Sequence, residues 1–393
     1  SRRRHTRFKC DWSSDVCSSD LGLLMGAMAW AQAPVDEVGK HFDLALQYSI
    51  EGKDALAIPE YRKVLELEPD LYEAHINFGQ VLLRAKQPAE ALPHLKRARE
   101  QKPGEFKPAY FLAETLFDLN QFSDAMPAFA AASALDPKSA PAELGWGRCL
   151  LRLDRRDEAL PHYRKAADLD PDVKSFLLEL AQAYEAKDDF NQAVALYREF
   201  PDNPAAVERI GVLSLRVGRN QDAIAALEAA VKASPTVANQ TALAQAYVRE
   251  KAIPKAEPVM ASVVKAEPKN YDLRMFYARI LRDQRKTAEA AAQFLEAARI
   301  QPVSAEAWSE LSGMLILAEQ YPQALAALDK VKELGAENAG HMFFRATTLD
   351  RLMLKKEALD YYERFLAASK NNPDQEFQAR QRIKLLEREV GKR

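Results

Sequence analysis

The chain has 393 residues, 48% of them hydrophobic, and its 55 Lys and Arg nearly balance 57 Asp and Glu, which gives a net charge of −2. This length and composition suffice for a large buried core, while a weakly acidic chain lacks the basic face that general nucleic-acid binding requires. After residue 20 the only cysteine is Cys149, which excludes a disulfide within that part of the chain.

The first 21 residues differ in character from the rest. Ser1–Arg7 and Asp11–Asp20 can both be back-translated into parts of a common sequencing adapter. We therefore interpret residues 1–21 as an adapter artefact, which has to be set aside before the fold is considered. The alternative is a genuine basic N-terminal region.

Residues 22–33 form an apolar run that ends in small residues, which is typical of the end of a secretory signal peptide. Ala29 and Ala31 fit the small-x-small rule for cleavage after Ala31, so we expect a truncated signal peptide and export, to the periplasm of a bacterium. The run is shorter than the about 20 apolar residues of a membrane-spanning helix. The alternative is an uncleaved N-terminal anchor shortened by the adapter; beyond such an anchor we expect no membrane association.

From Val38 onward one pattern recurs ten times, mostly every 34 residues. Counting Val38 as position 1, each repeat has a small residue at position 8, an alanine at 20 and a large apolar residue at 24, and seven repeats have a proline at 32. Such self-similarity marks a stacked-repeat protein. The expected repeats, numbered 1 to 10, are 38–71, 72–105, 106–139, 140–173, 174–203, 204–236, 237–270, 271–304, 305–338 and 339–372.

Within each repeat the apolar residues fall at helical spacings, one stripe at positions 4, 7, 8 and 11 and another at 20, 24 and 27. We therefore predict two short helices per repeat, joined by a turn near positions 14 to 17. The small residue at position 8 is expected where two helix backbones approach closely. Prolines at position 22, such as Pro59, are expected near the first turn of the second helix, where a missing N–H costs least.

Repeat 5 departs from this regularity, and one more amphipathic segment follows repeat 10. Repeat 5 is short, and Pro201 and Pro204 are expected to cut its second helix, so that the stack loosens there and divides into two halves. Residues 373–393 are amphipathic and rich in charged residues, as a helix that caps a stack should be.

The ten-fold pattern resembles the tetratricopeptide repeat, and the resemblance covers residues 38–372. It implies an all-α fold, an α-solenoid that winds as a right-handed superhelix of about ten helix-turn-helix repeats, followed by the capping helix. It also implies that the concave groove binds peptides or partner proteins.

No arrangement in the sequence indicates catalysis. It contains no HExxH, no Cys/His cluster, no GxSxG and no phosphate-binding glycine loop. His41 and His75 share position 4, and His94 and His162 share position 23, which places these side chains at equivalent points of different repeats. We therefore predict a non-enzymatic protein with no cofactor, no metal and no small-molecule substrate.

In the family that the pattern resembles, first-helix positions 2, 5, 6, 9, 12 and 13 face the groove. Arginine forks bind carboxylates and flat aromatic rings provide rigid contact area, so we expect a protein or peptide partner with acidic residues and aromatic or apolar anchors. The candidate groove residues are Tyr110, Phe111, Phe117, Arg148, Arg152, Arg209, Arg216, Arg279 and Arg282. The alternative is that these arginines pair with neighbouring Asp or Glu and that the aromatic rings pack between helices.

Some members of that family hold a C-terminal carboxylate in a clamp of five polar residues. Only Asn77 and Lys107 match its registers here, while Phe42, Leu46 and Phe111 occupy the other three, so this clamp is not expected. We thus predict a binding scaffold; the alternative is a structural subunit of a cell-envelope assembly that makes obligate contacts through its edges or convex face.

Overall fold

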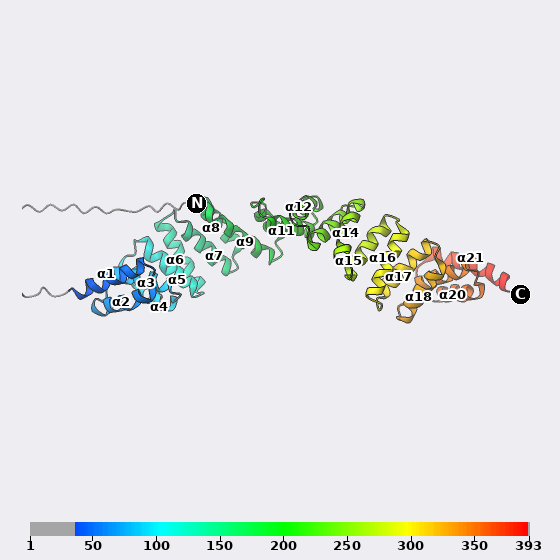
Figure 1. Cartoon of the computed structure of the whole chain (residues 1–393), viewed down its shortest axis with the longest axis horizontal. Coiled ribbons are helices and arrows are strands. Elements are labelled where there is room, and N and C mark those ends of the chain that lie inside the picture. The colour runs from blue at the N-terminus through cyan, green and yellow to red at the C-terminus, as the bar shows by residue number, and fades with distance from the viewer. Residues whose placement is uncertain (1–35, 392–393) are drawn as a thin grey trace, which may run out of the picture. The chain divides into compact units, whose positions relative to one another are not determined.

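The computed structural model describes residues 36–391, and every regular element in that range is a helix (Figure 1). The adapter-like segment and the expected signal peptide lie outside the described residues. Between residues 36 and 391 no helix has the length and apolar character needed to cross a membrane.

The described chain forms two compact units, one ending at Pro103 and the other beginning at Gly104. The first contains α1 (Glu37–Ile50), α2 (Asp54–Leu67), α3 (Tyr72–Arg84) and α4 (Pro88–Gln101). The second contains α5 (Phe106–Asp118), α6 (Phe122–Leu135), α7 (Ala140–Arg152), α8 (Arg156–Leu169), the 3-10 helix η1 (Pro171–Phe176), α9 (Leu177–Glu185), α10 (Phe190–Tyr197), α11 (Pro204–Arg216), α12 (Asn220–Ala233), α13 (Val237–Arg249), α14 (Ile253–Ala266), α15 (Tyr271–Asp283), α16 (Thr287–Ile300), α17 (Ala305–Leu317), α18 (Tyr321–Glu333), α19 (Ala339–Arg351), α20 (Lys355–Ala368) and α21 (Pro373–Val390).

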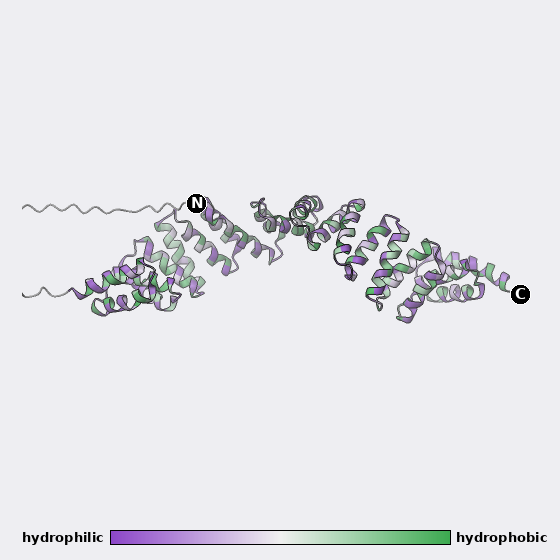
Figure 2. Cartoon of the chain, in the orientation of Figure 1, coloured by the Kyte–Doolittle hydropathy of each residue, from purple (hydrophilic) through white to green (hydrophobic). Residues whose placement is uncertain are grey.

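Each repeat consists of a first and a second helix that pack on each other, as predicted. Within each compact unit the second helix also packs on the first helix of the following repeat, as α6 does on α7 and α16 on α17. Hydrophilic and hydrophobic residues alternate along the helices (Figure 2). Every helix pair thus buries its apolar residues against its own partner and its neighbours.

The expected close approach at positions 8, 20 and 24 is confirmed. The alanine at position 20 is fully buried in all ten repeats, and the large residue at position 24 is at most 4% exposed. A Cβ atom built on Gly79 would lie 2.5 Å from Leu95 Cδ2, and one built on Gly211 would lie 2.5 Å from Leu227 Cγ. Position 8 is therefore small because the residue at position 24 of the same repeat fills the adjacent space.

The turn between the two helices has the same conformation in all ten repeats. In repeat 2, the Gln87 N–H donates to Leu82 O at 2.8 Å and the Lys86 N–H to Leu83 O at 3.0 Å, the two bonds of a Schellman motif. The residue at position 15 has a positive φ throughout; it is glycine in two repeats and carries a side chain in the other eight. These residues are Gly52, Lys86, Asn120, Asp154, Asp188, Gly218, Lys251, Arg285, Glu319 and Met353.

The prolines at position 22 lie deeper in the second helices than expected. Pro59 is the sixth residue of α2, and Pro93, Pro127, Pro161 and Pro258 occupy the same place in their helices. A proline there lies beyond the four N–H groups that lack a partner at a helix start. It therefore removes an internal hydrogen bond, and packing on both sides of the helix has to maintain the helical conformation.

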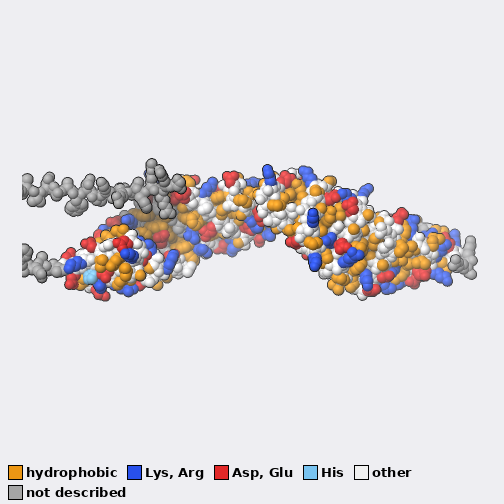
Figure 3. Space-filling model, viewed as in Figure 1, with side chains coloured by type: hydrophobic (Ala, Val, Ile, Leu, Met, Phe, Trp, Pro, Cys, Tyr) orange, Lys and Arg blue, Asp and Glu red, His pale blue; other side chains and the backbone are white. Residues whose placement is uncertain are grey.

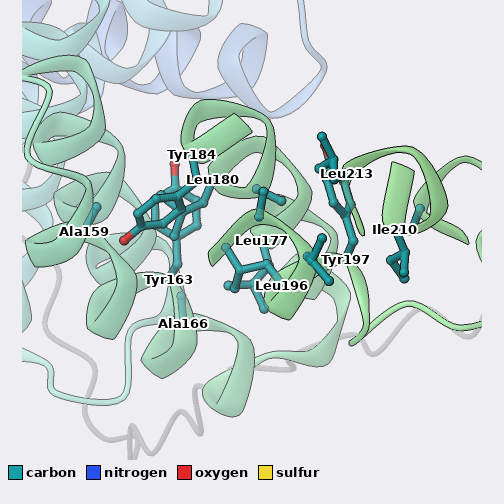
Figure 4. Close-up of a cluster of buried hydrophobic side chains, with 14 of the residues drawn as sticks. Ala159, Tyr163, Ala166, Leu177, Leu180, Tyr184, Leu196, Tyr197, Ile210 and Leu213 are labelled. Atoms are coloured by element: carbon teal, nitrogen blue, oxygen red, sulfur yellow. The ribbon is translucent and has the colours of Figure 1, made fainter. Parts of the chain in front are cut away.

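Repeat 5 is irregular but remains part of a continuous core. Its first helix, α9, has nine residues and its second, α10, has eight, whereas α8 and α12 have 14. Buried side chains nevertheless run without a gap from Tyr163 through Leu180 and Tyr197 to Leu213 (Figure 4). The second helix is shortened as expected, but the expected division of the stack at repeat 5 is wrong, because the core continues through it and the boundary between compact units follows Pro103.

Helix α21 packs on α20 at the end of the second compact unit. Ala379 and Leu386 are fully buried on its inner side. The Arg382 guanidinium reaches Asp350 of α19, with Nη2 at 2.8 Å from Oδ1. The helix thus occupies the place that the first helix of an eleventh repeat would take.

Candidate interaction face

All nine candidate groove residues lie in the second compact unit, on α5, α7, α11 and α15. We call the surface formed there by positions 2, 5, 6, 9, 12 and 13 of the first helices the first-helix face. On the side of the molecule visible in Figure 3, basic and acidic side chains alternate with hydrophobic ones, without an extended area of one charge.

The aromatic candidates of repeat 3 are half-buried and contact other rings. The Tyr110 ring lies 5.4 Å from that of Phe106 and 5.6 Å from that of Phe111. Its hydroxyl donates to Glu114 Oε1 at 2.6 Å. Burial raises the pKa of Tyr110 and also that of Glu114. The Tyr110 ring also lies 6.1 Å from that of Phe129 in α6, so Tyr110 packs between α5 and α6, as the alternative interpretation proposed.

Arg148 is held between two repeats by aromatic rings and a carboxylate. Its guanidinium carbon lies 5.2 Å from the Phe117 ring centre and 5.5 Å from that of Phe176. Its Nε lies 3.4 Å from Glu179 Oε2, yet this buried nitrogen makes no hydrogen bond. Stacking on two rings fixes the guanidinium plane while leaving its hydrogen-bonding capacity incompletely used.

Three further arginines pair with carboxylates of an adjacent repeat. Arg209 forms a two-pronged contact with Glu185, with Nε 3.1 Å from Oε2. Arg282 Nη1 lies 2.9 Å from both oxygens of Glu310, and Arg279 bonds Glu306. With Arg148–Glu179, these pairs join position 9 or 12 of one repeat to position 2 or 6 of the next, so they fix how consecutive first helices are aligned.

Arg152 and Arg216 differ from these four. Both are exposed, and neither side chain forms an ion pair or hydrogen bond with residues 36–391. Arg216 lies over the Phe190 ring at 5.4 Å. Both occupy position 13, one in repeat 4 and the other in repeat 6. They are the candidate arginines that remain available for a ligand carboxylate.

A second set of polar contacts, between the two helices of a repeat, was not anticipated. Position 4 of the first helix meets position 23 of the second, so that His75 Nδ1 lies 3.1 Å from His94 Nδ1 and Glu143 Oε2 lies 2.8 Å from His162 Nδ1. Glu143 is 1% exposed and also accepts from Lys165 Nζ at 2.7 Å. The sequence signal for this contact was a pair of polar residues at positions 4 and 23, since the two side chains are in contact in every repeat where both are polar.

The second helices also border an apolar cavity of about 440 Å³ between α16 and α18. Its lining includes Ala288, Ala291 and Ala292 of α16 and Trp308 and Leu311 of α17. The cavity is open because these alanine side chains are short.

Among the described residues no three His, Cys, Asp or Glu side chains are grouped as a metal site would require. The buried Cys149 has a pKa raised to about 12 by burial, so its thiol stays protonated at neutral pH.

Two family models match the chain, and both are described as tetratricopeptide repeat. The first matches residues 82–144, and the second matches residues 52–106, 144–204, 177–238 and 241–305. The matches cover more than half of the chain. The chain belongs to the tetratricopeptide repeat family. Such proteins generally mediate protein–protein interactions and are typically not enzymes. No curated protein sequence matches this tetratricopeptide repeat protein.

Several solved structures match this chain at low identity. The crystal structure of MamA protein is 22% identical, with a TM-score of 0.40 over 44% of this chain and 92% of that chain. MamA from Desulfovibrio magneticus RS-1 is 20% identical, with a TM-score of 0.39 over 42% and 94%. The APC/C hetero-tetramer Cut9-Hcn1 is 18% identical, with a TM-score of 0.31 over 66% and 52%.

Proposed function

We propose that this tetratricopeptide repeat protein is a non-enzymatic scaffold that binds acidic peptide segments of a partner protein through its first-helix face. The observation that carries the proposal is the contrast among the candidate arginines. Four of them form ion pairs within the protein: Arg148, Arg209, Arg279 and Arg282. The other two, Arg152 and Arg216, are exposed and unpaired, and both occupy position 13 of their repeats.

An acidic peptide suits this face for two physical reasons. An unpaired, exposed guanidinium can form a two-pronged contact with a carboxylate without first breaking an internal ion pair. The pre-packed helices also lose little conformational freedom when a ligand binds, which favours recognition of a flexible segment.

Peptide-display selection on residues 32–393 tests the proposal. The test variant is Arg152→Glu with Arg216→Glu; the control is Lys232→Glu with Lys265→Glu, which makes the same charge change at exposed, unpaired lysines of α12 and α14. We expect the parent and the control to enrich acidic peptides and the test variant to enrich none. Equal enrichment by all three proteins would remove the first-helix face from consideration.

A second candidate function is that of an assembly subunit that makes obligate contacts through its second helices. The apolar cavity between α16 and α18 favours it, because its Leu295 occupies a position that is charged in several other repeats. Light scattering after size exclusion should then show self-association that Leu295→Glu abolishes. A parent protein that stays monomeric at high concentration would count against this candidate.

We also propose export through cleavage after Ala31, on the basis of the apolar run at 22–33 and the small residues Ala29 and Ala31. The intact mass of the protein from the cells that produce it provides the test. A chain that begins at Gln32 would support export, whereas a retained apolar run would favour the membrane anchor.

A further inference from the structure

A cavity of about 350 Å³ opens on the first-helix face at the irregular repeat 5, between α9, α10 and α11. Its volume lies at the lower end of the range of about 300–1,000 Å³ for ligand pockets. The residues that matter for its shape are Leu178, Gln182, Ala186, Tyr197, Ala205 and Arg209. Apart from Tyr197, they belong to the registers that define the first-helix face.

The cavity lies where repeat 5 carries a short side chain at a register that is longer in the other repeats. Position 13 carries Ala186 in repeat 5, and this is the only small residue at that register; the other nine are Ile50, Arg84, Asp118, Arg152, Arg216, Arg249, Asp283, Leu317 and Arg351. Ala205 and Ala206 also line the cavity, at the start of α11. The short side chains of these three alanines leave this volume open.

The two charged groups at this cavity already pair with each other. Glu185 accepts hydrogen bonds from both Arg209 Nε, at 3.1 Å, and the Tyr197 hydroxyl, at 3.2 Å. Neither the carboxylate nor the guanidinium needs a charged ligand. An apolar side chain can therefore enter without leaving a buried charge unpaired.

The two unpaired arginines flank this cavity in the sequence of repeats. Arg152 lies at position 13 of repeat 4 and Arg216 at position 13 of repeat 6, so they hold the same register as Ala186 on either side of it. A ligand that crosses repeats 4 to 6 along this register meets a cation, an apolar cavity and a second cation. The complementary chemistry is an apolar side chain with carboxylates on both sides.

We propose that the cavity at repeat 5 is the anchor site for one large apolar or aromatic side chain of an extended peptide, whose flanking acidic residues bind Arg152 and Arg216. This inference rests on the proposed function, since it names the residue type that the bound peptide inserts.

Fluorescence anisotropy with labelled synthetic peptides tests the inference. The eleven-residue peptides carry glutamates in both flanks and differ only at the centre, which is Trp, Leu or Ala. The test variant is Ala186→Leu, which places a side chain in the cavity from its exposed wall, and the control is Ala225→Leu at an exposed alanine of α12. Thermal melting checks that both variants remain folded.

We expect the Trp peptide to bind the parent and Ala225→Leu about tenfold more tightly than the Ala peptide, a difference of about 1.4 kcal/mol. Ala186→Leu should abolish this preference and leave the affinity for the Ala peptide unchanged. Peptides that bind the parent equally well whatever their centre would overturn the anchor site while leaving the proposed function intact.

Indole binding, followed by nuclear magnetic resonance, separates the two hypotheses if no peptide binds. Indole-dependent shifts at Leu178 and Ala205 that disappear in Ala186→Leu would retain the site as an aromatic-binding cavity and refute the acidic-peptide function. Absence of both peptide and indole binding would refute both.

Discussion

At the scale of single residues, two glycines inside first helices have contrasting surroundings. A Cβ atom on Gly211 would lie 2.5 Å from Leu227 Cγ, whereas nothing lies within 4 Å of a Cβ atom on Gly313. Alanine is favoured over glycine in a helix by about 1 kcal/mol, so Gly313→Ala should stabilise the protein by about that amount. In Gly211→Ala the collision should prevail and destabilise by about 1–3 kcal/mol. Urea unfolding measures both; equal stabilisation would contradict the close approach.

The histidine pair of repeat 2 predicts a pH dependence. Burial, and then the neighbouring His75, lower the pKa of His94 from 6.5 to about 4. The unfolded chain therefore binds more protons than the folded one between these values, so stability is complete above pH 6.5 and is lost as the pH falls towards 4. Urea unfolding at pH 7.5 and 5 should show a loss in the parent that is smaller in His94→Gln. An identical loss in both proteins would show that His94 does not contribute.

The position of a residue within the repeat predicted whether it is buried, but it did not predict which polar side chains contact one another. The positions of Ala186, Arg152 and Arg216 could be compared in the sequence alone, and the exceptional alanine at position 13 was a usable signal. The pairing of Arg279 with Glu306 could not be predicted, because it depends on the offset between consecutive repeats. Phe176 was missed because it lies in the 3-10 segment before α9, where the helical register fails.

At the scale of helices, α21 shows how the stack ends. Leu386 is fully buried against the last repeat, while the adjacent Leu385 is 46% exposed. Leu386→Ala should cost about 2–5 kcal/mol of local stability, and Leu385→Ala should cost less than about 0.5 kcal/mol. Hydrogen exchange should accelerate in α19 and α20 of the first variant only. Unchanged exchange there would mean that α21 does not support the tenth repeat.

The helix pairs themselves were predictable because each repeat restates the same apolar registers. The predictions that failed concern places where the packing of one helix depends on its neighbours. The shortened α10 could be inferred from Pro201 and Pro204, but the continuous core through Leu180, Tyr197 and Leu213 could not. Whether a short repeat interrupts a stack depends on how adjacent helices close over it, which no periodicity within a single repeat reveals.

At the scale of the whole molecule, contacts link each repeat mainly to its immediate neighbours, so a local change should stay local. Ala159 is fully buried in α8, and Ala159→Leu should overpack it at a cost of about 1–3 kcal/mol. Hydrogen exchange should rise in α7 to α9 and stay unchanged in α17 to α20. A uniform rise across the second compact unit would indicate a single cooperative transition instead.

The residues with positive φ in the turns imply that the melting temperature of the protein can be raised by substitution. Eight of the ten residues at position 15 carry a side chain in a conformation that glycine adopts freely. Asp154 also forms ion pairs with Arg156 and Lys187. Replacing each of the other seven by glycine should relieve up to about 1 kcal/mol, reduced by the greater freedom of unfolded glycine. Met353→Gly should raise the melting temperature more than Asn120→Gly, because asparagine tolerates this conformation best. Since these seven sites lie in different repeats, their gains should add, which offers a route to a more stable engineered scaffold that leaves both binding faces untouched.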